Sequence, residues 1–162
     1  MNKIRILIRT EGHVTVGMGH IYRCIRIAKK FQELYNAEVR FIIAPTSIVG
    51  IKKVLDAGFK VDLVDFNNVK QYIKYIKKFS PRVVVNDILT IEEEYMKRLK
   101  ELNILTVNFE DKKESMARDY ADIIFNSLYD DKKSKAQYYH GPKYAPLKDS
   151  FKNIKVKKIN KI

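Results

Sequence analysis

Short apolar runs alternate with amphipathic segments along most of the chain, and the two patterns predict different elements. Runs rich in β-branched residues, such as Arg-Val-Val-Val-Asn-Asp at 82–87, are typical of strands that are buried on both faces of a parallel sheet. Between these runs, apolar residues recur at helical spacing, which predicts helices. The predicted strands are residues 3–9, 38–44, 60–65, 82–87, 104–109 and 122–126.

Capping and turn residues predict where the helices begin and end. The second helix is expected to start at Thr46 or Ser47 and to stop at Gly58, and the fourth to span 91–102 after Thr90 as N-cap. The third begins at Asn67, ends near Ser80-Pro81, and points Val69, Tyr72, Ile73 and Ile76 inward. The first spans 19–35 and has a predicted inward face of Cys24, Ile27, Ala28, Phe31 and Leu34.

This alternation predicts an α/β fold, because strand–helix repeats with short connections form a parallel sheet covered on both sides. We expect a doubly wound, mainly parallel, Rossmann-like sheet with helices on both faces and the strand order 3-2-1-4-5-6. The domain is predicted to cover residues 1–147. The periodicity fades from Lys148 onward, so 148–162 are interpreted as a basic C-terminal tail or a truncated linker.

Polar residues follow several of the predicted strands. Ligands of open α/β sheets bind outside the carboxyl ends of the strands, near the point where the strand order reverses. Residues at these ends are therefore candidates for binding. They are Arg9, Thr10 and Glu11 after the first strand, Asn86 and Asp87 after the fourth, Glu110 and Asp111 after the fifth, and Asn126 after the sixth.

The loop after the first strand carries the most informative stretch, Gly-Met-Gly-His-Ile-Tyr-Arg-Cys at 17–24. Gly17 and Gly19 allow a tight turn and a close approach to a ligand, and the helix that follows favours an anion at its N-terminus. A dinucleotide fingerprint is disfavoured because its third glycine would fall on Tyr22 and no acidic residue ends the second strand. The Gly-Lys-Ser/Thr of a phosphate-binding loop is also missing, so no nucleotide cofactor is expected.

His20 stands where this helix begins, and two interpretations of it are open. A helix N-terminus favours the neutral imidazole, which is able to act as a base, but His20 equally suits a capping or packing role. Arg23 is three residues on and either binds a phosphate or pairs with Asp87 or Glu110. Cys24 is four residues after His20, but no further ligands with metal spacing accompany the pair, so a buried thiol is favoured and no metal is expected.

Composition narrows the class of protein. The net charge of +13 invites a nucleic-acid interpretation, but the lysines are spread along helices and no recognition motif accompanies them, so no nucleic-acid partner is expected. No stretch approaches the roughly 20 apolar residues of a membrane span. The single cysteine excludes a disulfide framework within the chain and fits a reducing compartment, which predicts a cytoplasmic location.

Four ordered segments of the chain carry a resemblance to a known family. The first is the Gly-x-Gly-His-x-x-Arg-Cys segment at 17–24. The others are Val-Asn-Asp-Ile-Leu at 85–89, Val-Asn-Phe-Glu-Asp at 107–111, and the stretch with Ala-Asp-Ile-Ile-Phe-Asn at 121–126, Tyr129 and Tyr-His-Gly-Pro-Lys-Tyr at 139–144. Taken together, these segments resemble the UDP-sugar hydrolases of pseudaminic acid synthesis and the related spore-coat polysaccharide biosynthesis proteins. The resemblance runs from about Lys3 to Phe151.

The resemblance implies a GT-B-like architecture of two Rossmann-type domains, and a metal-free hydrolysis that releases UDP from a UDP-linked amino sugar. The family's catalytic histidine corresponds to His20, which would deprotonate the attacking water. Gly17 and Gly19 would let the backbone approach the sugar, and Asp87, Glu110 and Asp111 would orient sugar hydroxyls or His20. Two departures stand out. The second domain, which holds most of the UDP in this family, has no counterpart here, and Lys148 replaces the usual arginine.

Other functions remain open at this point. MurG-like glycosyltransferases share the architecture, and His20 would then activate a sugar hydroxyl in place of water. A non-catalytic sugar-binding or assembly module is a further alternative, with a second GT-B-like domain or another copy of the chain as partner. Since half a cleft cannot position a leaving group, the chain by itself is expected to turn over substrate poorly.

Overall fold

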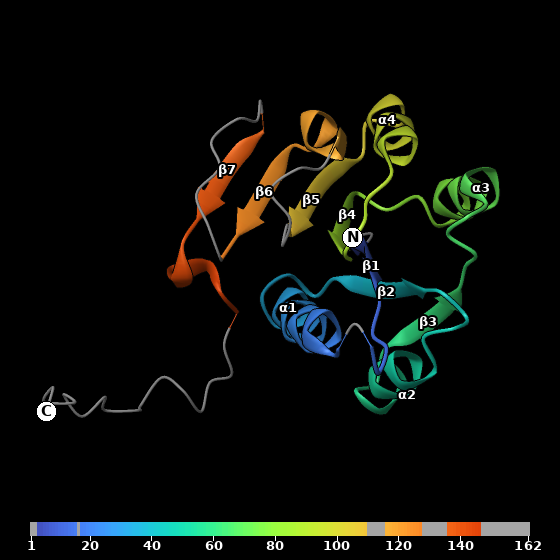
Figure 1. Cartoon of the computed structure of the whole chain (residues 1–162), viewed down its shortest axis with the longest axis vertical. Coiled ribbons are helices and arrows are strands. Elements are labelled where there is room, and N and C mark those ends of the chain that lie inside the picture. The colour runs from blue at the N-terminus through green and yellow to red at the C-terminus, as the bar shows by residue number, and fades with distance from the viewer. Residues whose placement is uncertain (1–2, 16, 110–115, 128–135, 147–162) are drawn as a thin grey trace, which may run out of the picture.

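The computed structural model describes residues 3–15, 17–109, 116–127 and 136–146. They form a seven-stranded sheet of order β3-β2-β1-β4-β5-β6-β7 in which all neighbouring strands are parallel (Figure 1). The strands are β1 (Arg5–Thr10), β2 (Glu38–Ile43), β3 (Lys60–Leu63), β4 (Val83–Asp87), β5 (Leu105–Phe109), β6 (Ile123–Asn126) and β7 (Gln137–His140). The predicted fold class and the order 3-2-1-4-5-6 are confirmed, with β7 added at one edge.

Helices cover both faces of the sheet, as right-handed crossovers between parallel strands require. The helices α1 (Gly19–Tyr35) and α2 (Ile48–Asp56) lie on one face, and α3 (Val69–Phe79) and α4 (Glu93–Glu101) lie on the other (Figure 1). Two short 3-10 helices, η1 (Met116–Tyr120) and η2 (Pro142–Tyr144), flank the last strands. Each face has its own apolar core, one built on Ile8, Phe41 and Val85 and one on Leu7, Ile42 and Val84.

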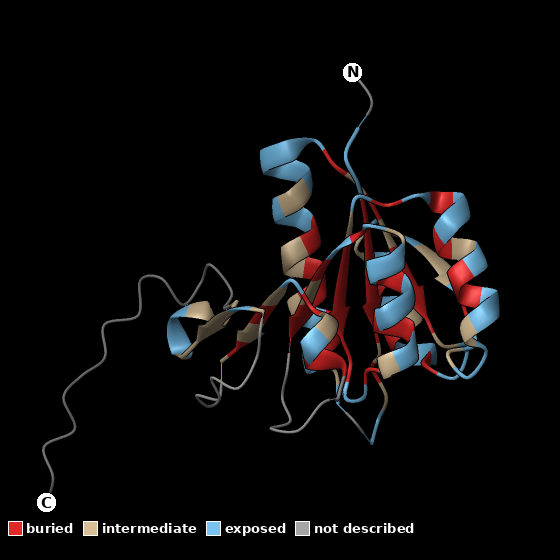
Figure 2. Cartoon of the chain, turned by 90° about the horizontal axis from the view of Figure 1, so that it is seen from above, coloured by how far each residue is buried: buried red, intermediate tan, exposed pale blue. Residues whose placement is uncertain are grey.

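Burial follows the alternation of side chains along the strands. Figure 2 shows buried strands at the centre and helices whose outer faces are exposed. In β4, Val84, Val85, Asn86 and Asp87 are all buried, because this strand lies at the centre of the sheet with a helix layer on each side. Two polar residues at the end of a buried strand must find partners within the protein.

Several element boundaries differ from the predicted ones, and β7 was not predicted at all. The N-cap of α4 is Glu92 and not Thr90, and Asn68 is the N-cap of α3, where its side chain accepts a hydrogen bond from the Gln71 amide. Ser47 precedes α2 as predicted, but its hydroxyl makes no cap hydrogen bond. In β7, Gln137–His140 pairs with β6 in a register that its four residues alone do not reveal.

The predicted inward face of α1 is partly wrong. The residues that pack into the core are Ile21, Cys24, Ile25 and Ala28, together with His20. Ile27 and Phe31 are partly buried and pack against this core as predicted, whereas Leu34 is 68% exposed. An apolar stripe broad enough for two faces cannot show by its spacing which face meets the sheet, since the helix is free to rotate about its axis until tertiary contacts fix it.

The proposed tail at 148–162 lies outside the described residues. Among the residues that are described, we find no helix that combines the length and apolar character needed to cross a membrane.

Raising the pH above about 10 should lower the free energy of unfolding. Burial raises the pKa of the Tyr95 phenol above its ordinary value of 10.0. A group whose pKa is raised by folding stabilises the protein fully below its unfolded pKa, and this contribution is lost as the pH rises toward the folded pKa. Each such phenol adds a slope of up to about 1.4 kcal/mol per pH unit.

Urea unfolding between about pH 8 and pH 11 measures this slope. Tyr95→Phe should make the slope shallower, although Tyr72, whose pKa burial also raises, keeps part of it. Tyr35→Phe is the matched control, because Tyr35 is 60% exposed and should leave the slope unchanged. Equal slopes in the parent chain and in Tyr95→Phe would contradict the prediction.

Candidate functional site

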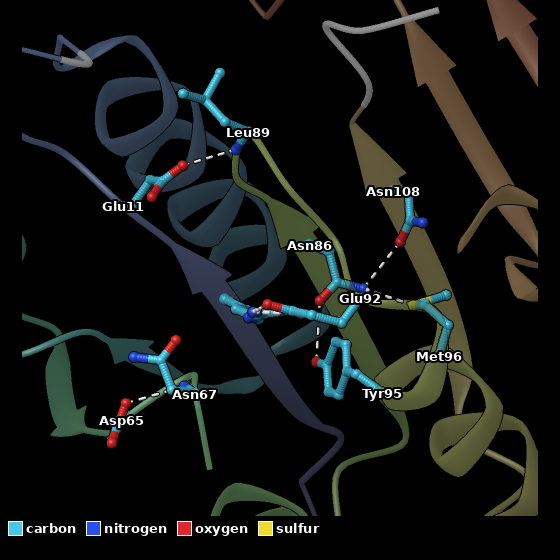
Figure 3. Close-up of polar contacts among 10 residues, drawn as sticks. Glu11, Asp65, Asn67, Asn86, Leu89, Glu92, Tyr95, Met96 and Asn108 are labelled. Carbon is cyan, nitrogen blue, oxygen red and sulfur yellow. Dashed lines mark hydrogen bonds and ion pairs between the residues drawn. The ribbon is translucent and has the colours of Figure 1, made fainter. Parts of the chain in front are cut away.

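The carboxyl ends of the strands meet at one edge of the sheet, and the loops after β1 and β4 are joined there. The Glu11 carboxylate accepts a hydrogen bond of 2.7 Å from the Leu89 amide (Figure 3). β1 and β4 are neighbours in the sheet although two strands, β2 and β3, separate them in sequence order, so this edge is the point at which the strand order reverses. The position is the one expected for a ligand in an open α/β sheet.

A serine from the β2–α2 connection fixes the start of the β1–α1 loop. The Ser47 hydroxyl donates to the Gly12 carbonyl oxygen at 2.6 Å and accepts from the Gly12 amide at 3.0 Å. A Cβ atom at Gly12 would lie 2.5 Å from Cγ1 of Ile21, and one at Gly50 would lie 2.6 Å from the Ser47 hydroxyl. Two glycines and a serine thus let the loop lie directly against both α1 and α2. The contact between Gly12 and Ser47 was not predicted, since nothing local in the sequence connects the two residues.

The two glycines of the Gly-x-Gly segment have different conformations. Gly17 has a φ of +87° and its amide donates to the His13 carbonyl oxygen at 2.7 Å, which closes a tight turn. That φ is strained for other residues. Gly19 is exposed, and an ideal Cβ built there meets nothing within 4 Å. The backbone at Gly19 is therefore accessible from outside the protein.

His20 is the second residue of α1. The N-cap is Met18, which makes no side-chain cap hydrogen bond, and the first turn contains no acidic residue. The first-turn amides and the positive end of the helix dipole are thus not neutralised by a carboxylate of that turn. His20 is 8% exposed, so it is largely buried. The neighbouring residue in the helix, Gly19, is exposed.

Arg23 and Asp87 form a bidentate ion pair between α1 and the end of β4. Nε of Arg23 donates to Oδ2 at 2.7 Å and Nη2 donates to Oδ1 at 2.5 Å. Asp87 is fully buried and the Arg23 guanidinium lies 5.1 Å from the centre of the Phe109 ring. Of the two roles expected for Arg23, the structure shows the pairing with Asp87.

Cys24 is a buried thiol on the same side of the sheet. Its Sγ donates to Oδ2 of Asp87 at 3.3 Å. Burial raises the pKa of the thiol well above its usual value, and the negative charge of Asp87 raises it further. In the described part of the chain, no three His, Cys, Asp or Glu side chains are grouped so that they could hold a metal ion. Cys24 thus lies under the loop as a neutral packing residue.

A second polar cluster lies on the opposite face of β1 and β4. Arg9 is fully buried, and its guanidinium lies 4.3 Å from the ring centre of Phe66 and 4.6 Å from that of Tyr95. Its charge is balanced by Glu92, whose carboxylate is 2.8 Å away and whose side chain is 38% exposed. Arg9 is therefore inside the domain, and Glu92 presents a fixed carboxylate at the sheet edge. Glu92 was not predicted as a site residue because it stands among three consecutive glutamates.

Side-chain amides fill the rest of this cluster. The Asn86 amide donates to Oδ1 of Asn108 at 2.9 Å, and its Oδ1 accepts from the Tyr95 hydroxyl at 3.0 Å (Figure 3). Asn86 is thus a structural residue of the buried sheet. Thr10 and Asn126 are buried as well, while Glu110 and Asp111 lie outside the described residues.

Comparison with known proteins agrees with the fold. No protein-family model matches the sequence. An uncharacterized protein of Methanocaldococcus jannaschii is 34% identical over 167 residues, which cover 98% of this chain and 34% of that protein. The chain therefore spans about a third of the length of this curated relative. The crystal structure of MurG from Acinetobacter baumannii matches 83% of this chain and 44% of its own, with a TM-score of 0.67 at 12% identity. The chain has a GT-B-like, Rossmann-type fold.

Asp87→Asn should destabilise the protein, since it removes the charge of a fully buried carboxylate that pairs with the Arg23 guanidinium. Breaking a buried pair from one side costs about 3 kcal/mol. The matched control is Asp56→Asn, which removes the exposed Lys52–Asp56 pair of α2 and should change stability by less than about 1 kcal/mol. Chemical unfolding of the three proteins gives the comparison, and equal losses in the two variants would refute the buried-pair argument.

The two loop glycines should differ sharply when each is replaced by alanine. Gly12→Ala pushes a methyl group against Ile21 and should lower stability by about 1–3 kcal/mol. Gly19→Ala places the methyl group in open space and should leave the unfolding midpoint nearly unchanged. Thermal unfolding followed by circular dichroism tests both, and a large loss for Gly19→Ala would show that this position is packed.

Proposed function

We propose that this chain is one half of a two-domain enzyme that hydrolyses a UDP-linked amino sugar to the free sugar and UDP in surface-polysaccharide or nonulosonic acid biosynthesis. The observation that carries the proposal is His20 in the first turn of α1, beside the exposed Gly19, at the edge where the strand order reverses. The MurG likeness supports it at the level of the fold, because the family that the sequence resembles has a GT-B-like architecture too. The sequence resemblance supplies the reaction.

In this proposal His20 is the general base. It takes a proton from a water molecule, which attacks the anomeric carbon as the bond to the UDP oxygen breaks, and UDP leaves with the bonding electron pair. Gly17 and Gly19 bring the backbone close to the sugar. The uncapped first turn of α1 favours the negative charge that develops on the leaving group or the diphosphate.

The remaining candidates divide between binding and positioning. Glu11 lies at the sheet edge, and we assign it, with Glu110 and Asp111, to the orientation of sugar hydroxyls. Thr10 is buried beneath this edge and would act through its neighbours. Asp87 and Arg23 bind each other, so we assign them to positioning: their pair holds the first turns of α1 against β4 and thereby sets the place of His20.

A glycosyltransferase acceptor domain is the second candidate, and the likeness to MurG favours it specifically. The same base would then remove a proton from a sugar hydroxyl, and that oxygen would attack the anomeric carbon in place of water. UDP release that requires an added sugar acceptor distinguishes the transferase from the hydrolase. A non-catalytic sugar-binding module is a third candidate, and in that case His20 would have no role in turnover.

Release of UDP from a panel of UDP-amino sugars tests the proposal directly. The chain is assayed alone and together with any separately encoded second domain, with and without sugar acceptors. His20→Gln should lower kcat at least about 100-fold with the fold unchanged, because general-base catalysis contributes about 10²–10⁴. His13→Gln, in the loop that precedes α1, is the matched control and should keep the parent rate. If folded proteins release no UDP, either alone or with a second domain, the assignment as an enzyme is contradicted.

A further inference from the structure

The helices α3 and α4 lie side by side on one face of the sheet (Figure 1). Between them is a hollow of about 340 Å³, which we call the α3–α4 hollow. Its α3 side is lined by three exposed lysines, Lys70, Lys74 and Lys77. They stand at positions i, i+4 and i+7 of the helix, so they form a single stripe about 10 Å long. An elongated stripe of positive charge thus borders the hollow.

The lysines of α3 have no negative charge on their own helix. Of the four α-helices that the structure describes, only α3 contains neither aspartate nor glutamate. On each of the other three, an exposed lysine pairs with a carboxylate one turn away, as Lys52 does with Asp56 of α2. Among the described residues, no carboxylate forms an ion pair with the three lysines of the stripe. Like charges at i and i+4 destabilise a helix, so α3 keeps this stripe at a cost in stability.

The α4 side of the hollow carries a different charge. Arg98 lies there between two carboxylates, 3.7 Å from that of Glu94 and 3.1 Å from that of Glu101. Two glutamates and one arginine leave this side slightly negative. A polyanion that is charged all round, such as a nucleic acid, would be attracted by the lysines and repelled by the glutamates. The hollow therefore favours an occupant that is negatively charged on one side only.

Apolar side chains line the hollow between these two charged sides. Val69 and Leu102 are partly buried and Ile73 is 8% exposed, and all three belong to the core of this face of the sheet. Because little of their surface remains accessible, apolar contact alone would not hold a partner here. The arrangement suits a partner whose apolar residues adjoin its acidic ones, as they do on an amphipathic helix. Such a helix laid into a groove is a recurring mode of recognition.

We propose that the α3–α4 hollow binds an acidic amphipathic helix of a partner protein, whose carboxylates face Lys70, Lys74 and Lys77. Carboxylates at positions i, i+4 and i+7 of the partner helix form a stripe of the same length as the lysines, because both follow the same helix geometry. The hollow lies on the face of the sheet opposite α1. The inference therefore does not depend on the proposed reaction or on the role of His20.

A synthetic peptide with this pattern of charge tests whether the full chain binds such a helix. The probe is about 18 residues long, because much shorter isolated helices are marginal in water. It carries glutamates at i, i+4 and i+7 and leucines on the adjoining stripe. Fluorescence anisotropy should show saturable binding that weakens as salt is added, since the charges are exposed to water. The same peptide with glutamines in place of the glutamates is the matched control. If the acidic peptide binds no better than this control, the proposal is wrong.

The variant Lys74→Glu separates binding from folding. It should weaken binding of the acidic peptide at least about fivefold, because it removes one ion pair and adds a repulsion. It should also raise the Tm by about 1–3 °C, because a glutamate at this position has Lys70 and Lys78 one turn away on either side. Lys100→Glu replaces an exposed lysine of α4 that does not line the hollow. It is the matched control and should bind the peptide as the parent chain does.

A short DNA duplex, measured with the same two variants, distinguishes a protein partner from a nucleic acid. Any binding of DNA should be equal for Lys74→Glu and Lys100→Glu, because both substitutions change the net charge of the chain by the same amount. Equal binding of the acidic peptide by the two variants would overturn the proposal. A loss of DNA binding that is confined to Lys74→Glu would overturn it too, since the hollow would then take a nucleic acid.

Discussion

Parallel pairing of β1 with β4 is the constraint on which the rest of the domain depends. Parallel strands need a crossover for every connection, so helices must cover both faces and all strands must point the same way. Every loop that leaves a strand toward its crossover helix then lies at one edge. Because the strand order reverses between β1 and β4, the loops that follow these two strands lead to opposite faces of the sheet. The Gly-x-Gly turn and His20 lie at this point of reversal. The position of the candidate site is therefore a consequence of topology.

Buried charges border this pair of strands on both faces, and each is balanced within the domain. Arg23 and Asp87 tie α1 to the end of β4, while Arg9 and Glu92 tie β1 to the beginning of α4. A buried charge without a partner would be costly, so these pairs fix the two helices in position relative to the strands. Ser47 adds a third connection between the β1–α1 loop and the start of α2. The helix α1, which carries His20, is thus tied to β4, and the loop before it is tied to the start of α2.

The likeness to MurG concerns the fold, whereas the resemblance in sequence concerns individual motifs. At 12% identity the former concerns the path of the backbone, which is compatible with many reactions. In the function proposed above, the chemistry depends on a few side chains at the sheet edge, above all on whether His20 takes a proton from water or from a sugar hydroxyl. The chain spans 44% of MurG and 34% of the curated relative from Methanocaldococcus jannaschii, so the likeness concerns part of each protein.

The sequence by itself determined the class of fold and the full extent of α1, because strand and helix periodicities are local properties. The order of the first six strands was predicted from the general rule for doubly wound sheets. The sequence also identified the Gly-x-Gly-His segment, whose backbone requirements are visible in residue type. Only the tertiary structure decided that Arg23 pairs with Asp87, that Arg9 lies buried with Glu92, and that Ser47 holds Gly12. It also decided which side of α1 faces the sheet and left Leu34 outside. These features join residues 35 to 83 positions apart, and the spacing within any one segment carries no information about such a partner.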